Sequence, residues 1–356
     1  FDKFKSEKKE TPELTVNYNP IPGKEHRAEK GIDEAEKLIE SIFLTRDLIN
    51  QPANVIYPET LADITKERLE AKGVKVTVYG RKEIEELKME AFLNVARASA
   101  KEPKLIVMEY YNNPESDERI ALVGKGLTYD SGGYAIKPAT GMVDMHTDMG
   151  GAGTVIGAMN ALASLKAKAN VFAVVASCEN MISGDGYRNG DIIGSMSGKT
   201  IEIINTDAEG RLTLADAVYY ATNNMGATKL IDLATLTGAC VMALGEQVSG
   251  VVTNNDEFFN KLVEGNERAG EMVWKMPATD YYKKMNDSKT ADIKNSGGKL
   301  GGMMTAGLFV GSFLAKEIPW IHVDIAGTAS VEKAYGYIKE GATGVMVKSL
   351  YYALAE

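Results

Sequence analysis

The amino-acid sequence predicts an α/β fold in which a central mixed, largely parallel sheet carries helices on both faces, giving three layers. Two observations lead to this prediction. Short β-branched or apolar runs alternate along the chain with longer segments whose apolar residues recur at helical spacing. Some of the short runs, such as residues 120–124 and 171–177, are apolar without interruption, which is typical of strands buried on both faces.

The first elements follow from local signals. Residues 31–50 have the helical period, and Pro52 ends this helix because proline disfavours helical geometry in the residue before it. Residues 57–73 predict a second helix, with a proline near its start and a glycine after its end. Residues 74–80 alternate between apolar and polar, as a strand does.

The remaining segments continue the alternation. Strands are expected at residues 103–112, 119–126, 170–178 and 201–205, and helices at 153–167 and 212–222. The same pattern runs on through 229–238, 247–254, 255–270, 301–317, 319–327 and 341–356.

Composition indicates a soluble globular protein. The chain has 356 residues, of which 44% are apolar and 25% charged, and its net charge of −9 argues against nucleic-acid binding over the whole surface. Cys178 and Cys240 offer no disulfide framework, which indicates free thiols and a reducing compartment. The longest apolar run, residues 171–177, is too short to cross a bilayer. We therefore expect a cytoplasmic protein with no membrane partner.

The N-terminal residues differ from the rest. The chain begins at Phe1, and its first ten residues are mostly charged and show no period. We expect residues 1–30 to form a linker or extended arm and residues 31–356 to form the functional domain.

One polar motif, "NTDAEGRL" at residues 205–212, separates a β-branched run from a helical segment. In an extended loop, side chains two residues apart share a side, so Asp207, Glu209 and Arg211 would point the same way. Two adjacent carboxylates repel unless positive charge lies between them. Arg211 could supply that charge, so the motif alone does not distinguish a polar turn with an acidic helix start from a metal site.

A second motif shifts the balance toward a functional site. Residues 122–154 leave a central strand for a glycine-rich loop. This loop carries Lys125, Asp130, Lys137, Asp144 and Asp148. Glycines at 124, 126, 132 and 133 allow tight, positive-φ backbone there. Both motifs fall where strands end, which is where α/β sheets bind ligands.

The residue types favour metal chemistry. Only three histidines are present, so we expect carboxylate ligands, and four carboxylates suffice for two ions that share ligands and activate a water. A lysine could add an amine ligand if a metal lowered its pKa.

Several residues near these motifs are expected to have no metal-binding or catalytic role, or to admit a purely structural one. Asp144 is expected to be a solvated acid, Asp216 a structural residue of its helix, and His146 a pocket or surface residue. Asp148 alone could be a helix cap. "DSGG" at 130–133 lacks the surroundings of a serine nucleophile, and "GGAG" at 150–153 lacks a nucleotide-binding fingerprint.

Together the motifs resemble the leucine aminopeptidase family, the cytosol aminopeptidases. "NTDAEGRL" is similar to the family signature, and "VGKGLTYDSGG", Lys137 and "DMGGAG" are similar to its other metal and catalytic segment. The resemblance covers residues 31–356, and Phe1–Lys5 resemble the end of a segment that follows an N-terminal domain in the family. It implies a zinc-exopeptidase-like fold and hydrolysis of N-terminal, leucine-like residues from peptides.

The resemblance also implies roles. Lys125, Asp130, Asp148 and Glu209 would hold one divalent ion, while Asp130, Asp207 and Glu209 would hold the other. A water between the ions would attack the peptide carbonyl. Lys137 would polarise that carbonyl, and Arg211 would hold a bicarbonate ion as general base.

Further expectations concern specificity, metal and assembly. Met145, Thr235, Gly238 and Ala326 match the family's side-chain pocket, whereas Ala329 stands where some members have methionine. Zinc or manganese is expected, with magnesium or cobalt possible. A homo-hexamer formed through the catalytic domain is implied.

Two other functions are considered as alternatives to an aminopeptidase. Some relatives also bind DNA, but the acidic charge counts against this here. A two-metal phosphohydrolase would use the carboxylates yet offers no role for the two lysines. An inactive homologue would have lost a ligand, and all seven matched positions are filled.

Overall fold

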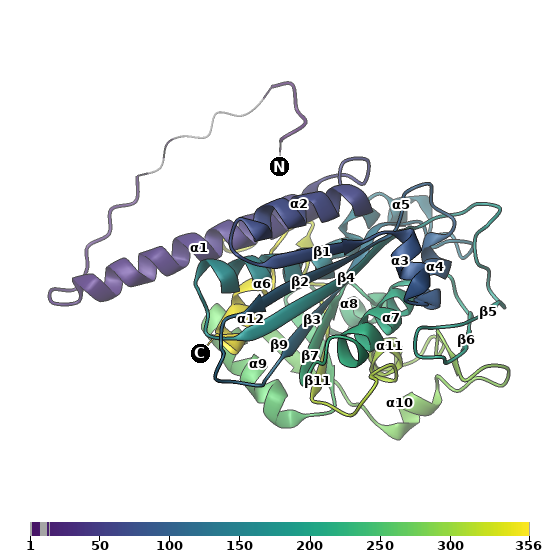
Figure 1. The fold of residues 1–356 in the computed structure, drawn as a ribbon. Coiled ribbons are helices and arrows are strands. Elements are labelled where there is room, and N and C mark those ends of the chain that lie inside the picture. Colours follow the sequence, from purple (N-terminus) through teal and green to yellow (C-terminus); the bar gives the residue numbers. More distant parts are fainter. Residues whose placement is uncertain (1, 8–12, 14, 356) are drawn as a thin grey trace.

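The computed structural model describes residues 2–7, 13 and 15–355, and within them an eight-stranded sheet has the order β1-β2-β4-β3-β7-β11-β8-β9 (Figure 1). Its strands are β1 (Lys75–Tyr79), β2 (Lys104–Tyr111), β3 (Ile120–Asp130), β4 (Asn170–Asn180), β7 (Lys229–Ala234), β8 (Val248–Thr253), β9 (Met272–Lys275) and β11 (Trp320–Asp324). The central strands β4, β3, β7 and β11 are parallel, whereas β1, β2 and β8 add antiparallel pairings. This confirms the predicted mixed, largely parallel sheet.

Helices cover both faces of this sheet. The larger ones are α1 (Glu25–Asn50), α2 (Pro58–Glu70), α4 (Glu90–Ala96), α6 (Gly150–Ser164), α7 (Gly210–Asn223), α9 (Asp256–Ala269), α11 (Gly302–Gly311) and α12 (Val347–Leu354). Along β3, Ile120 and Leu122 pack in one apolar cluster with α1, α2, α6, α9 and α12, while Ala121 and Val123 pack in another with α4, α7 and α11. The period-2 alternation of β3 therefore produces the predicted three layers.

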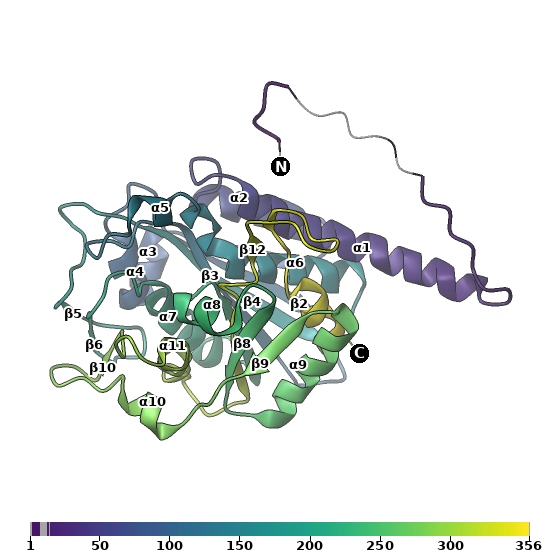
Figure 2. The same cartoon turned by 180° about the vertical axis from the view of Figure 1, so that it is seen from behind.

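Short elements complete the fold. They are α3 (Arg81–Glu86), α5 (Ala139–Met142), the 3-10 helix η1 (Met145–Met149), α8 (Gly238–Leu244) and α10 (Asp280–Lys284), with the small sheets β10 (Ile293–Lys294), β6 (Ile201–Glu202), β5 (Ile192–Ile193) and β12 (Ser330–Val331), β13 (Gly341–Ala342). The reverse view shows β5, β6 and β10 beside α11, away from the central sheet (Figure 2).

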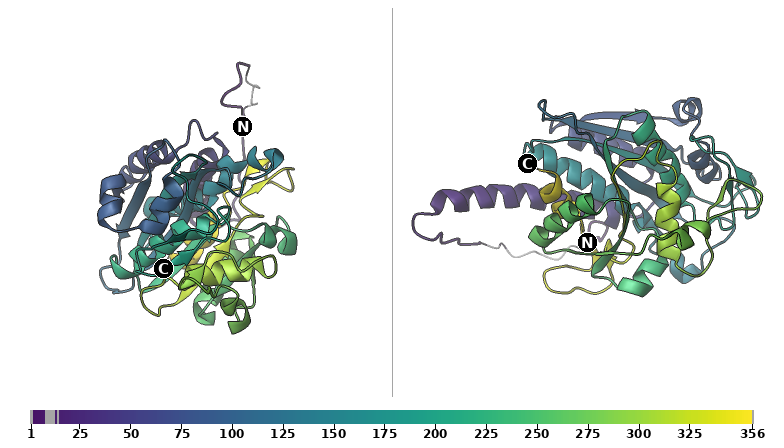
Figure 3. Two further views of the ribbon diagram at one scale, coloured as in Figure 1. Left: turned by 90° about the vertical axis from the view of Figure 1, so that its right-hand side faces the viewer. Right: turned by 90° about the horizontal axis from the view of Figure 1, so that it is seen from below.

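Three predictions about elements need correction. The first helix begins at Glu25 rather than residue 31, and its N-terminal part extends past the rest of the molecule (Figure 3). Residues 1, 8–12 and 14 of the predicted arm lie outside the described residues. The predicted strand 201–205 is only β6, because the chain there pairs in the small sheet and then turns. β3 continues to Asp130, beyond the predicted end at residue 126, so Asp130 lies on the same strand as Lys125 and not in a loop.

Two further features concern the cysteines and the helices. Cys178 and Cys240 are buried free thiols. Among the described residues, no helix combines the length and the apolar character needed to cross a membrane.

Candidate active site

The first part of the site is built on β3. Lys125 and Asp130 are buried on this strand, and the start of α6 lies directly against it. A Cβ atom on Gly151 would lie 2.0 Å from the Leu233 carbonyl oxygen and 2.8 Å from the backbone nitrogen of Lys125. Only glycine permits this approach, which brings Asp148, in the preceding 3-10 helix, up to Lys125.

The loop after β3 returns Lys137 to the strand end. Gly132 and Gly133 have φ values of 85° and 60°, in the left-handed region. The backbone nitrogen of Lys137 donates a hydrogen bond to the Ser131 carbonyl oxygen. Gly124 serves close packing instead, since its Cβ would lie 2.8 Å from Ala152 Cα, and neither it nor Gly126 has positive φ. Positive φ was thus predicted correctly only for the second glycine pair.

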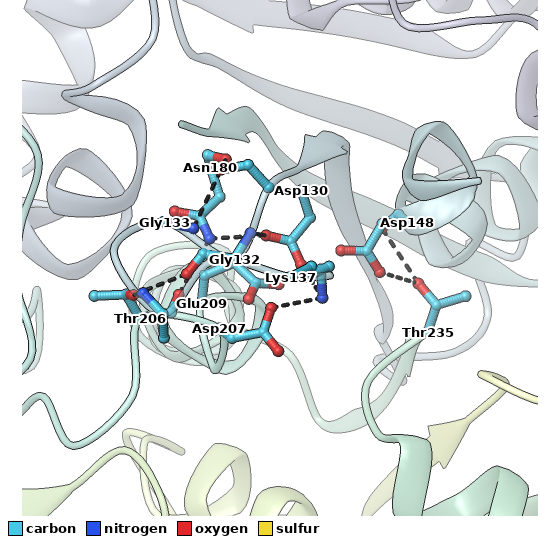
Figure 4. A network of polar contacts seen from close by, with 12 residues as sticks. Asp130, Gly132, Gly133, Lys137, Asp148, Asn180, Thr206, Asp207, Glu209 and Thr235 are labelled. Atoms are coloured by element: carbon cyan, nitrogen blue, oxygen red, sulfur yellow. Dashed lines mark hydrogen bonds and ion pairs between the residues drawn. The ribbon is translucent and has the colours of Figure 1, made fainter. Parts of the chain in front are cut away.

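The second part of the site is the turn at residues 205–211. The Ala208 nitrogen donates to the Asn205 carbonyl, and Glu209 has helical φ and ψ at the N-cap of α7. The predicted extended alternation is therefore wrong, because the chain turns and begins a helix at this point. Asp207 and Glu209 nevertheless face the β3 residues, as the close view shows (Figure 4).

Two lysines link the carboxylates. Lys125 Nζ lies 2.8 Å from both Asp148 oxygens and 2.9 Å from Glu209 Oε1. Lys137 Nζ lies 2.8 Å from Asp130 Oδ2 and 2.6 Å from Asp207 Oδ1. Each lysine thus joins a residue of the β3 side to a residue of the turn.

Burial shifts the pKa values of these groups in opposing ways. Burial, followed by repulsion from Asp130, raises the pKa of Glu209 to about 8, and burial also raises the pKa of Asp148. Burial disfavours the charged amine of Lys125, but attraction from Asp148 and Glu209 outweighs it and raises its pKa. The site therefore concentrates negative charge that only nearby cations make tolerable.

This donor set fits divalent metal ions. One oxygen from each of Asp130, Asp207 and Glu209 lies within 4.8 Å of the others. Glu209 Oε2 is buried and has no hydrogen-bond partner among the described residues, which is costly unless a cation or donor faces it. With Asp148 these residues supply the oxygen ligands that two adjacent ions require.

Arg211 lies in the first turn of α7 and is buried. Its Nη1 donates to the Asn295 carbonyl at 2.8 Å, while its Nε has no partner among the described residues. Burial lowers the pKa of Arg211 to about 10, so the guanidinium still carries its charge at neutral pH. It can therefore hold an anion.

A cavity of about 390 Å³ joins these groups. Its lining includes every residue predicted for metal binding, catalysis or the side-chain pocket: Lys125, Asp130, Lys137, Met145, Asp148, Asp207, Glu209, Arg211, Thr235, Gly238 and Ala326. Ala329 also lines it.

Asp144, His146 and Asp216, which were expected to have no metal or catalytic role, lie outside this cavity. Asp144 is exposed and His146 is half-buried at an adjoining hollow. Asp216 is fully buried and accepts hydrogen bonds from the Phe92 and Met196 nitrogens, as a structural residue does. Asp148 makes no side-chain capping bond to α6; it accepts from Thr235 Oγ1 at 2.8 Å instead.

Sequence reasoning missed three supporting residues. Asn180 donates to Asp130, Asn295 binds the 204–208 backbone, and Asp324 accepts from Leu236, Thr237 and Ala326. Asn180 ends β4 directly beside the end of β3, and this strand-end position could have indicated it. Asp324 likewise ends β11 beside the end of β7, whereas Asn295 carries no local signal.

Comparison with known proteins shows the family to which this chain belongs. The model of the cytosol aminopeptidase family, catalytic domain, matches residues 43–351. The chain belongs to the cytosol aminopeptidase family. It is 83% identical over its full length to a probable cytosol aminopeptidase of Treponema denticola, covering 75% of that protein, and 52% identical to one of Clostridium tetani, over 99% of this chain and 73% of that one.

Solved structures agree with this membership. The bottromycin maturation enzyme BotP has a TM-score of 0.90 at 33% identity, over 99% of this chain and 75% of its own. BotP in complex with Mn has a TM-score of 0.88 at 34% identity, over 91% and 71%. As a member of this family, the chain is a peptide hydrolase, a metal-dependent aminopeptidase.

Proposed function

We propose that this aminopeptidase removes leucine-like residues from peptide N-termini, with two divalent ions held between the two motifs. Lys125, Asp130, Asp148 and Glu209 would hold one ion, and Asp130, Asp207 and Glu209 the other. The observation that carries this proposal is the cluster of buried Asp130 and Glu209 with half-buried Asp207, in which Glu209 Oε2 has no hydrogen-bond partner among the described residues. When bound, such ions act as Lewis acids toward water and the peptide carbonyl.

Lys137 is proposed to polarise the scissile carbonyl. Its amine lies at the rim of the cluster, its side chain is 17% exposed, and nearby carboxylates keep it protonated. A protonated amine at the cavity wall can donate to an oxygen that gains negative charge during attack.

Arg211 is proposed to hold bicarbonate as the general base. Its buried guanidinium is anchored through Nη1, while Nε remains available to a small anion. An anion there would accept the proton of the attacking water and return it to the leaving amine.

The cavity wall is proposed to select leucine-like residues. Met145 and Ala326 are apolar and Gly238 is small. A Cβ atom added to Gly238 would have no other atom within 4 Å, so there is open space in front of it. This leaves an apolar recess for an unbranched or γ-branched side chain. We further propose a cytoplasmic homo-hexamer, following the family resemblance; light scattering of the purified chain tests the assembly.

The decisive experiment is hydrolysis of leucine p-nitroanilide before and after chelation, with manganese or zinc then restored. We expect activity to disappear with the chelator and to return with metal. Parallel assays with p-nitrophenyl phosphate test the phosphohydrolase alternative. Hydrolysis that survives chelation, or none with any metal, would contradict the proposal, and metal content of Lys125→Ala would show whether the ligand set is at fault.

A further inference from the structure

Asn180 occupies a position where the two parts of the site meet. It is the last residue of β4, paired in register with Asp130 at the end of β3, and its side chain is fully buried. Its Nδ2 donates to Asp130 Oδ1 at 2.8 Å and to the Thr206 carbonyl oxygen at 3.1 Å. One amide nitrogen thus contacts both the strand that carries Asp130 and the residue next to Asp207 (Figure 4).

The orientation of this amide follows from its partners. A carboxylate and a carbonyl can only accept hydrogen bonds, so the amide nitrogen must face them both. Its oxygen points away and has no partner among the residues that the structure describes. A Cβ on Gly133 would lie 3.1 Å from this oxygen, so the neighbouring loop leaves it little space.

The contact has a consequence for Asp130. Asp130 Oδ1 accepts from Asn180 Nδ2 and also from the Gly132 nitrogen at 2.9 Å. Oδ2 is the oxygen that approaches Lys137. Two donors on one side therefore leave the other oxygen directed into the site.

We propose that Asn180 is a positioning residue of the metal site, which holds Asp130 and the 206–207 backbone at one separation and thereby sets the affinity for divalent cations. This inference rests on the proposed function, because it assigns Asp130 and Asp207 to the metal. Hydrogen-bond partners of metal ligands affect metal affinity by about 10- to 100-fold.

The variant Asn180→Asp tests this inference. It keeps the shape but replaces the NH₂ group by a carboxyl oxygen, which cannot donate to the Asp130 carboxylate and the Thr206 carbonyl together, so the link between strand and turn is lost. We expect the metal-stripped full chain to bind Mn²⁺ about 10- to 100-fold more weakly, measured from the electron paramagnetic resonance signal of free Mn²⁺. The visible spectrum of the Co²⁺-loaded variant should change as well, because the ligand geometry changes.

A matched control lies on the same strand. Asn170 begins β4, and its Nδ2 donates to two carbonyl oxygens, those of Asn113 and Ser116, at 2.8 Å each. Asn170→Asp removes an equivalent pair of bonds at the opposite end of the strand, so we expect it to lower thermal stability while Mn²⁺ affinity and the Co²⁺ spectrum stay as in the wild type.

The outcomes separate the two hypotheses. A wild-type chain that binds no Mn²⁺ would refute the metal site itself. Equal affinity of wild type and Asn180→Asp, or an equal loss in both asparagine variants, would refute the role of Asn180 alone. If Asn180→Asp does not fold, Asn180→Ala is titrated in the same way, and wild-type affinity in that variant would overturn the proposal.

Discussion

The two halves of the site are supported in different ways. The strand flank, which we define as Lys125 and Asp130 on β3, is held by backbone pairing with β4 along its length and with β7 up to Gly124. The turn flank, residues 205–211, belongs to no strand of the central sheet and is held mainly by side chains that bind its backbone.

Asn295 is the main support of the turn flank. Its Oδ1 accepts from the nitrogens of Ile204 and Asn205, and its Nδ2 donates to the Asn205 and Ala208 carbonyls. Its own carbonyl binds Arg211. Backbone pairing between strands therefore positions one set of ligands, whereas a few buried polar side chains position the other.

The largest expected effect comes from Lys137, one of the two lysines that join both flanks. Lys137→Met keeps the length of the side chain but removes the charge that lies between Asp130 and Asp207. We expect kcat to fall about 10²- to 10³-fold, since a donor to a developing oxyanion is worth about 3–4 kcal/mol. The measurement is steady-state hydrolysis of leucine p-nitroanilide at saturating metal. Lys168→Met, which removes an exposed pair with Glu115, should leave kcat unchanged.

The strand flank should break by overpacking. Gly151→Ala places a methyl group 2.0 Å from the Leu233 carbonyl oxygen, so backbone must move, and we expect a loss of about 3 kcal/mol of unfolding free energy. Urea denaturation measures it. Gly31→Ala, in the helix α1 with no atom within 4 Å of the new methyl, should gain up to about 1 kcal/mol. Equal behaviour of the two variants would contradict the role given to close packing.

The turn flank should break by loss of hydrogen bonds. Asn295→Ala leaves backbone groups of residues 204–208 without their buried partner, which should cost about 2 kcal/mol of unfolding free energy. Mn²⁺ affinity should fall with it, because Asp207 and Glu209 lie in or beside this turn. Asn286→Ala, which loses one bond to the Thr305 carbonyl, should reduce stability but not Mn²⁺ affinity.

The smallest effect concerns pH and the helix that follows the turn. Burial, with a lesser contribution from Glu90, raises the pKa of Asp216 on α7 to about 7. A carboxyl group whose pKa is higher in the folded than in the unfolded protein binds its proton more tightly in the folded state. The free energy of unfolding therefore falls as pH rises from the unfolded pKa through the folded pKa. Between pH 6 and 7.5 we expect this group to lower stability by on the order of 1 kcal/mol. Thermal melts of Asp216→Asn should lack that part of the pH dependence; an unchanged profile would contradict it.

Much of the fold and the site could be predicted from sequence. The alternation of elements predicts the layered sheet, because periods of 2 and 3.6 are local properties of the chain. The motifs at 122–154 and 205–212 contain every residue that we propose for metal binding and catalysis. The extended geometry predicted for Asp207, Glu209 and Arg211 was wrong, because Asn295, some 90 residues away, binds the backbone there as a turn.

By itself, the sequence determined the element pattern, the two acidic motifs with their two lysines and, through their resemblance, the family of this protein. Only the tertiary structure decided that Lys125 and Lys137 each join the two flanks, and that Asn180 and Asn295 hold the ligands in place. These contacts depend on backbone atoms brought together by strand order and turn geometry. Hydrogen bonds to a distant backbone leave no local pattern, since any residue at the receiving position offers the same nitrogen or carbonyl.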